Sequence, residues 1–378
     1  MYLTKEEEQM LNGEAGEVKE RLFRLLVRLG DIYGAEKMIP VGSVQVAGVS
    51  YKSIGEPGTT FLEDMAAKQA KAQVLTFLNP AGMDLEDYRE LGFPEDFAQN
   101  QLRIINAFKQ MGIVITSTCT PYLAGNLPRF REHIAWSESS AVSFSNSVIG
   151  ARTNREGGPS ALAASICGRT PEYGLHLWKN RQPTIKIKVE ADLSFTSDYG
   201  ALGYLVGKKV KNKIPFFTGI KDANTDHLKS LGAAMAASGA VALYHVKNLT
   251  PEADLIDTSV NETITVEQKD IDETYETLTE GDSPDIVILG CPHASLREIA
   301  TLAEKVEGKQ LKKPINSSPA PVSIPGTPGP PPVEPRRPTV PSAACSESLP
   351  AAPAASPGDR PRGTPWSRST CSARALSR

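Results

Sequence analysis

Apolar residues recur along most of the chain at two spacings, one typical of helices and the other typical of strands. Short apolar runs bounded by turn residues predict strands at 42–50, 74–78, 112–117, 183–190, 240–246 and 285–289, and extended segments at 255–268 and 271–279. Helical periodicity predicts helices at 14–29, 60–73, 94–110, 161–167, 225–238 and 294–306. Because strands and helices alternate, we expect an α/β fold with mostly parallel sheets and flanking helices.

A cysteine follows the apolar run at two of the predicted strand ends. Cys119 comes after GIVITST, and Cys291 comes after DIVILG and just before a predicted helix. In open α/β sheets, ligands bind beyond the carboxyl ends of strands, at the N-termini of the following helices. A helix N-terminus lowers the pKa of a thiol and favours the thiolate that binds metals. Spacing alone leaves the alternative open that both residues are small buried apolar groups. Cys167, at the end of a small-residue helix, ranks below them as a ligand.

Two further strand ends carry residues suited to ligand binding. The strand at 42–50 ends in Gly48, Val49 and Ser50, where small side chains let the backbone approach a ligand. The strand at 74–78 runs into Asn79 and Pro80, and the Asn79 amide can face a ligand or satisfy local backbone groups. A simple turn is the alternative explanation for both segments.

The segment 134–158 is rich in Ser, Asn, Gly and Arg. Glu138 stands between hydroxyl residues, and Arg152, Asn154 and Arg155 offer groups suited to carboxylate or phosphate oxygens. This segment is therefore either part of a binding site or a flexible surface loop.

Composition narrows the choice of partners and compartment. The chain has 378 residues, and its 41 Lys and Arg against 44 Asp and Glu give a formal charge of -3. This balance gives no indication of nucleic-acid or membrane binding, so we expect a small molecule or another protein as partner. Five irregularly spaced cysteines and a polar N-terminus argue against a secreted disulfide framework, and we expect a cytoplasmic protein.

The character of the chain changes at about Lys312. From there to Arg378, Pro, Ser, Ala, Gly and Arg dominate and no periodic apolar pattern remains, so we expect residues 313–378 to be a disordered tail. The strand and helix predicted at 285–306 should nevertheless lead into another strand. One hypothesis is that the tail is a shifted reading frame of a GC-rich gene, and a genuine disordered extension is the other.

Six linked motifs within residues 1–312 resemble the catalytic subunit of the aconitase X family, in the expected order. They are GVSYKSIG at Gly48, LNPAGMD at Leu78, STCTPYL at Ser117, WSESSAV at Trp136, NSVIGARTNREGGPSAL at Asn146 and GCPHAS at Gly290. The resemblance implies an aconitase-like fold and an iron-sulfur dehydratase, in which three thiolates hold a 4Fe-4S cluster with one iron left open. Matched position by position, Cys119 and Cys291 correspond to cluster ligands. The family's substrate contacts correspond to Gly48, Val49, Ser50, Asn79, Pro80, Glu138 and Ser139.

The reaction implied by the resemblance converts (R)-5-phosphomevalonate, a phosphorylated hydroxy acid, to trans-anhydromevalonate 5-phosphate in an archaeal mevalonate route to isoprenoids. The proton-abstracting serine of the family is expected on a small swivel-domain subunit, so the resemblance implies a heterodimer. Alternatives are the same chemistry on another hydroxy acid such as cis-3-hydroxy-L-proline, or a non-catalytic subunit without a cluster.

The chain departs from the family pattern after Lys312. The family has a third cysteine ligand and a substrate-contacting lysine there. Neither has a matching context in this chain, where Cys345 and Cys371 stand among Ser, Ala and Pro.

Overall fold

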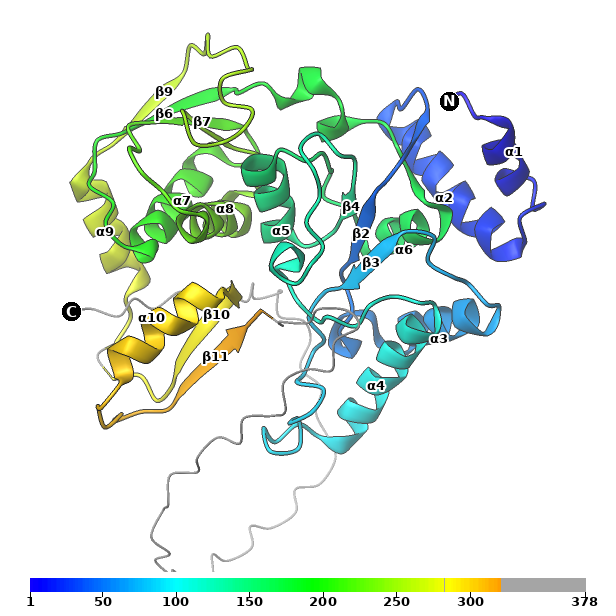
Figure 1. The fold of residues 1–378 in the computed structure, drawn as a ribbon, viewed down its shortest axis with the longest axis horizontal. Coiled ribbons are helices and arrows are strands. Elements are labelled where there is room, and N and C mark those ends of the chain that lie inside the picture. The colour runs from blue at the N-terminus through cyan, green and yellow to red at the C-terminus, as the bar shows by residue number, and fades with distance from the viewer. Residues whose placement is uncertain (282, 321–378) are drawn as a thin grey trace, which may run out of the picture.

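The computed structural model describes residues 1–281 and 283–320, so most of the predicted tail lies outside the described residues. All pairings in the two larger sheets are parallel, as predicted, and among the described residues one antiparallel pair joins the short strands Met38–Pro40 and Arg169–Pro171. Figure 1 shows three groups of elements: one around β2, one around β6, and a smaller one around β10.

The first group is built on a three-stranded sheet with the order β3-β2-β4. The central strand β2 (Ser43–Val46) pairs in parallel with β3 (Leu75–Leu78) and β4 (Ala135–Trp136). Helix α6 (Gly158–Cys167) packs against β2 and β4, and α2 (Glu17–Tyr33) packs against α6. The sheet is therefore covered on this side by two layers of helix.

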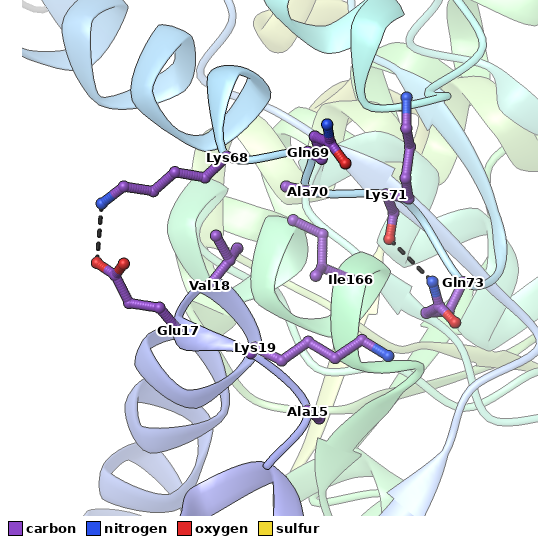
Figure 2. A pocket seen from close by; sticks show the side chains of 11 residues that line it. Ala15, Glu17, Val18, Lys19, Lys68, Gln69, Ala70, Lys71, Gln73 and Ile166 are labelled. Atoms are coloured by element: carbon purple, nitrogen blue, oxygen red, sulfur yellow. Dashed lines mark hydrogen bonds and ion pairs between the residues drawn. The ribbon is translucent and has the colours of Figure 1, made fainter. Parts of the chain in front are cut away.

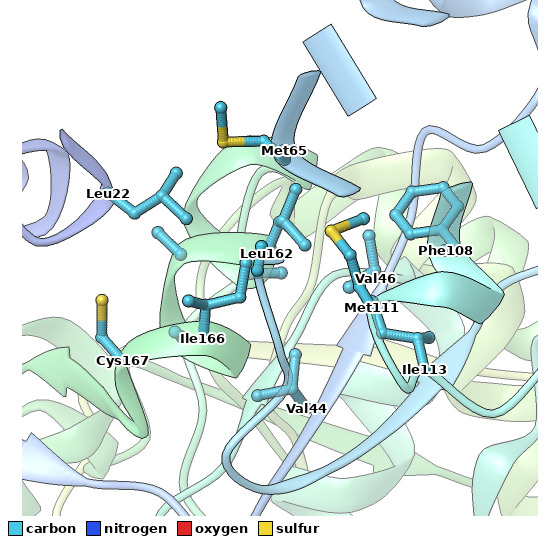
Figure 3. Packing of buried hydrophobic residues seen from close by; sticks show 14 of the residues in the cluster. Leu22, Val44, Val46, Met65, Phe108, Met111, Ile113, Leu162, Ile166 and Cys167 are labelled. Atoms are coloured by element: carbon cyan, nitrogen blue, oxygen red, sulfur yellow. The ribbon is translucent and has the colours of Figure 1, made fainter. Parts of the chain in front are cut away.

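All four residues of β2 are buried, so both faces of this strand are covered. Val44 and Val46 share one face and belong to the same apolar cluster as Leu162, Ile166 and Phe108, which Figure 3 shows. Ser43 and Gln45 share the other face, where Oγ of Ser43 accepts a hydrogen bond from Nε1 of Trp136 at 3.2 Å. The remaining elements of this group are α1 (Lys5–Leu11), β1 (Met38–Pro40), α3 (Tyr51–Ala67), α4 (Glu95–Gln110), α5 (Ser139–Phe144) and β5 (Arg169–Pro171).

The second group is a four-stranded parallel sheet with the order β8-β7-β6-β9. Its helices α7 and α8 pack against each other, and α9 packs against α7. Apolar residues of the strands and of all three helices form one core cluster. The elements are β6 (Ile185–Val189), α7 (Thr196–Val210), β7 (Pro215–Thr218), α8 (Thr225–Gly239), β8 (His245–Val246), β9 (Thr263–Val266) and α9 (Gln268–Leu278).

The third group is a β-α-β unit. Strand β10 (Val287–Ala294) leads into α10 (Leu296–Val306), and β11 (Ile315–Pro319) returns parallel to β10. This confirms the prediction that residues 285–306 lead into another strand. The tail therefore does not start at 313 as an unpaired segment, because the ladder to β10 extends to Pro319.

Three local predictions are wrong. Helix α3 starts at Tyr51 rather than near residue 60, since Ser50 caps its first turn and a positive φ at Gly55 kinks the helix before Pro57. The segment 112–117 runs beside β3 but forms only one isolated bridge, between Val114 and Phe77, and a φ of 46° at Ser117 ends the extended path.

The third error is α9, whose residues were expected to be extended. Glu267 and Asp270 form a capping box at its start, and Ile271 and Thr274 are buried one helical turn apart. The alternation of apolar and basic residues at 183–190 favours a half-exposed or an edge strand, and β6 is the half-exposed inner strand of its sheet.

Candidate active site

Three of the predicted site segments meet at the carboxyl ends of β2, β3 and β4. The side chain of Gln45, on β2, donates from Nε2 to the backbone oxygen of Thr118 at 3.1 Å and to Oδ1 of Asn79 at 3.4 Å. Its Oε1 atom accepts a hydrogen bond from the backbone N–H of Glu138 at 3.4 Å. One buried amide thus connects Asn79, Glu138 and the residue that precedes Cys119.

The predicted substrate segment 48–50 lies against the loop that continues from the other predicted segment, 79–80, to Gly82. A Cβ atom at Gly82 would stand 2.2 Å from Oγ of Ser50, so a larger residue does not fit there without a shift. Gly48 has a φ of +77°, which favours glycine, and Val49 is buried. Pro80 lies in the turn between β3 and Gly82.

His293 joins the segments of the two predicted cluster ligands. Its backbone N–H donates to Sγ of Cys119 at 3.1 Å, and its ring Nδ1 forms a 3.1 Å hydrogen bond with Oγ1 of Thr118. Cys291 lies two residues before His293, and its charge acts on the Cys119 thiol. The structure therefore brings together two cysteines that are far apart in the sequence.

Burial raises the pKa of the Cys119 thiol to about 12, while the N–H of His293 opposes the rise and the charges of Glu138 and Cys291 add to it. The expectation of a lowered thiol pKa at a helix N-terminus is therefore wrong for Cys119. The element that follows it is only the 3-10 turn Pro121–Leu123, which is too short to offset burial.

Glu138 and Ser139 stand at the start of α5. Oε2 of Glu138 accepts hydrogen bonds from the N–H of Ala141 at 2.7 Å and from Oγ of Ser140 at 2.6 Å, and Oγ of Ser139 donates to Oε1 at 3.3 Å. Glu138 is thus the N-cap of α5, a structural role that the sequence did not reveal. The surface-loop alternative for this segment is wrong, since α5 and a π-helical turn at Ser145–Ile149 form its middle and most of residues 134–154 are buried.

The two candidate anion-binding arginines lie in different surroundings. Nη1 of Arg152 donates to the backbone oxygen of His176 at 3.3 Å, and its guanidinium lies 6.0 Å from the ring centre of Trp178. Arg155 lies near Glu138: burial lowers the pKa of Arg155, and the Glu138 carboxylate opposes that shift. Only Arg155 is therefore near the other predicted site residues.

Several hydroxyls beside these residues are buried without a hydrogen-bond partner. They are Oγ of Ser117, the hydroxyl of Tyr122 and Oγ of Ser137, which flank Cys119 and Glu138 in the sequence. Unsatisfied buried polar atoms are uncommon in proteins and are expected where a ligand completes the site.

The described residues do not complete a site for a cluster held by three thiolates. Cys119 and Cys291 supply two, and Cys167 is buried in the core beside α2. No group of three His, Cys, Asp or Glu side chains in the described part of the chain is arranged to hold a metal ion. Cys345 and Cys371 lie outside the described residues.

A cavity of about 390 Å³ lies elsewhere, between the start of α2 and the segment 68–73. Figure 2 shows that Lys68 turns toward Glu17, with which it forms a 2.8 Å ion pair. The amine of Lys71 points away from this pair. None of the predicted site residues lines this cavity.

None of the helices in residues 1–281 and 283–320 combines the length and apolar composition needed to cross a bilayer.

Cys291 lies within β10 and not after a strand ending at Leu289 as predicted, because the ladder to β11 continues to Ala294. The parallel sheets, together with the contact between the segments of Cys119 and Cys291, are those of an aconitase-like α/β protein. The family model described as "Aconitase X first domain" matches residues 1–179, and "Aconitase X second domain" matches residues 183–276. The chain belongs to the aconitase X family.

Known proteins agree with this assignment. The phosphomevalonate dehydratase large subunit of Methanocaldococcus jannaschii is 57% identical over 322 residues, which cover 82% of this chain and 80% of the relative. The crystal structure of Thermococcus kodakaraensis aconitase X in its holo-form has a TM-score of 0.78 and 50% identity, and the match covers 83% of this chain and 80% of that chain. The cis-3-hydroxy-L-proline dehydratase of Pseudomonas aeruginosa is 33% identical over 80% of this chain, but only 54% of that relative is covered.

Sequence reasoning missed the residues that hold these segments together. Gln45 stands inside an apolar run, and Gln101 stands in an amphipathic helix. Nothing in the neighbouring sequence of either residue indicates a role in the site. His293 and Thr118 were detectable, since each adjoins a predicted ligand. Lys229, whose Nζ donates to the backbone oxygen of His293 at 3.0 Å, is recognisable only in three dimensions.

Proposed function

We propose that this chain is the large subunit of a dehydratase that converts (R)-5-phosphomevalonate to trans-anhydromevalonate 5-phosphate. The observation that carries the proposal is the 57% identity, over 322 residues, to a protein named as the large subunit of phosphomevalonate dehydratase. The geometry supports it, because the residues matched to substrate contacts converge at the ends of three parallel strands.

Loss of water from such a substrate breaks a C–O bond and a C–H bond on neighbouring carbons. The hydroxyl leaves with the electron pair of the C–O bond, a base takes the proton, and the C–H electrons form the double bond. On this proposal the base belongs to a small partner subunit, and the large chain binds and orients the substrate.

The loops at 48–50 and 79–80, together with Glu138 and Ser139, would contact the substrate. Arg155 is the candidate for its phosphate, since no side chain in the described part of the chain hydrogen-bonds to it and it lies near Glu138. Cys119 and Cys291 would be two ligands of an iron-sulfur cluster, and the described residues offer no third thiolate beside them. When bound, such a cluster supplies a Lewis acid for the leaving hydroxyl.

The test uses the full chain together with a small aconitase X subunit, iron and sulfide. We expect dehydration of (R)-5-phosphomevalonate, detected as a new vinylic proton by NMR, and at least a roughly hundredfold loss in Cys119→Ser and in Cys291→Ser. Cys167→Ser is the matched control, because this thiol is buried in the core away from the site, and it should keep both iron and activity.

Three results would contradict parts of the proposal. Turnover by the large chain alone would refute the assignment of the base to the partner. Preference for cis-3-hydroxy-L-proline, the substrate named for the 33% identical relative, would favour that second candidate function. Substrate binding without any iron in the parent chain would indicate a non-catalytic subunit.

A further inference from the structure

Two glutamine side chains are completely buried beside the predicted substrate site. Gln45 on β2 and Gln101 on α4 each have 0% of their surface exposed. Glutamine is mostly exposed in proteins, because burying its amide costs free energy unless every polar atom is bonded. Here the amide of each residue is bonded through both its oxygen and its nitrogen.

Gln101 ties the two predicted substrate loops together. Its Oε1 atom accepts a hydrogen bond from the N–H of Tyr51 at 2.9 Å and lies 3.4 Å from the N–H of Gly82. Its Nε2 atom donates to the backbone oxygen of Val49 at 3.0 Å. One side chain thus fixes the backbone on both sides of Ser50 and the backbone of the loop that follows Asn79.

Gln45 makes the corresponding connection on the cysteine side. It bonds the side chain of Asn79, the backbone oxygen of Thr118 and the backbone N–H of Glu138. Asn79 belongs to a loop that Gln101 also holds, so the two amides form a continuous brace from Val49 to the segment of Cys119.

We propose that Gln45 and Gln101 are positioning residues that set the spacing of the substrate-binding loops and of Glu138. This inference rests on the proposed function for the identity of the substrate. The connections themselves are properties of the chain without substrate. Neither glutamine needs to touch the substrate, because each acts through the backbone groups it holds.

The first experiment measures amide hydrogen exchange in the full chain without substrate, for the parent, Gln101→Met and Gln45→Met. Methionine keeps the length of the side chain and removes the hydrogen bonds. We expect exchange at the amides of Tyr51 and Gly82 to rise at least about tenfold in Gln101→Met, and at Glu138 in Gln45→Met. Gln99→Met is the control, since Gln99 is exposed on the same helix as Gln101.

The second experiment measures the affinity for (R)-5-phosphomevalonate of the full chain assembled with its small subunit. We expect Gln101→Met to weaken binding about tenfold or more, while Gln99→Met stays within about twofold. The variant Gln101→Glu tests whether Gln101 acts through its hydrogen bonds or only by filling space in the core. A protonated carboxyl can donate to the Val49 oxygen as the amide does, and burial favours that neutral form.

The affinity of Gln101→Glu should therefore recover toward the parent value as the pH falls from about 8 to about 6, while Gln101→Met shows no such recovery. If both variants fold, keep the loop amides protected and bind substrate like the parent, the proposal is overturned. A parent that fails to bind phosphomevalonate counts against the proposed function alone, because the exchange experiment still decides the role of the glutamines. Should Gln101→Met fail to fold, amide hydrogen exchange in Gln101→Glu at the two pH values decides whether Gln101 positions the loops.

Discussion

Single buried side chains give this protein a defined response to acid. His245, on β8, is 1% exposed, and its Nε2 atom donates to the backbone oxygen of Arg181 at 2.9 Å. Burial lowers the pKa of His245 from 6.5 to about 4, although the bond to Arg181 opposes that shift and the Arg181 charge adds to it. His176 is a similar case, since burial and the neighbouring charge of His133 lower its pKa to about 3.

The folded chain therefore binds fewer protons than the unfolded chain between the lowered pKa of His245, about 4, and its ordinary value of 6.5. The stabilisation is complete above pH 6.5 and is lost as the pH falls toward 4, at up to about 1.4 kcal/mol per pH unit. His245→Gln keeps an N–H donor in the place of Nε2 but does not titrate. We expect urea unfolding at a series of pH values to show a slope smaller by up to about one proton in this variant. An unchanged slope would show that His245 does not contribute.

Among single residues, the sequence predicted those with distinctive chemistry that follow a predicted strand. Cys119 and Cys291 were predicted as site residues because each follows a predicted strand, and Glu138 because it stands between hydroxyl residues. The roles of Gln45 and Gln101 could not be found this way, because they depend on partners 19 to 93 residues away in the sequence.

Among the elements, α6 begins against the end of β2, and its first residue leaves no room for a side chain. A Cβ atom at Gly158 would lie 2.6 Å from the backbone oxygen of Ala47, directly before the loop at 48–50. The neighbouring Gly157 has its nearest contact at 3.7 Å, so a methyl group fits there. The start of α6 therefore fixes how closely the helix approaches the end of β2.

Replacing each of these two glycines by alanine distinguishes the effect of the close contact with Ala47 from the effect of alanine on helix formation. We expect Gly158→Ala to lower the free energy of unfolding by about 1 to 3 kcal/mol, because overpacking displaces either α6 or the loop. Gly157→Ala should change it by less than about 1 kcal/mol. Denaturant unfolding checks both values, and equal effects would mean that the contact with Ala47 relaxes freely.

Element type was predictable where one periodicity dominates, as in α2, α4, α8 and α10. It failed where the pattern is mixed. The helix α9 carries only two buried residues among polar ones, and the β-branched run 112–117 has a strand on one side only. In these segments, packing against the rest of the chain decided the secondary structure rather than the local preference of the residues. Such packing cannot be read from a single sequence.

Across the whole molecule, a few buried cations join parts of the chain that are distant in sequence. Arg181 is 0% exposed, lies between the two family domains, and bonds Glu252 at 2.8 Å and Asn146 at 3.0 Å. Lys229 on α8 reaches the third group of elements, where it bonds the backbone oxygen of His293 and the carboxylate of Glu298.

Lys229→Met should loosen the β10-α10-β11 unit without unfolding the rest of the chain. Its loss removes two hydrogen bonds and leaves the Glu298 carboxylate without its cation, at a cost of about 2 kcal/mol. Hydrogen exchange should accelerate in β10 and α10 and stay unchanged in β2 and α6. Lys209→Met, on the exposed side of α7, is the control. Equal acceleration everywhere would mean that the unit is not held separately.

The hydrogen bond between His293 and Cys119 spans 174 residues of sequence. A ribosome that adds about 5 to 20 residues per second needs roughly 10 to 35 s to make that interval. During this time the first domain can fold, but the Cys119 thiol lacks the N–H of His293. The contact between the two cysteine segments therefore forms only after translation has passed β10, so the order of synthesis places it late in assembly.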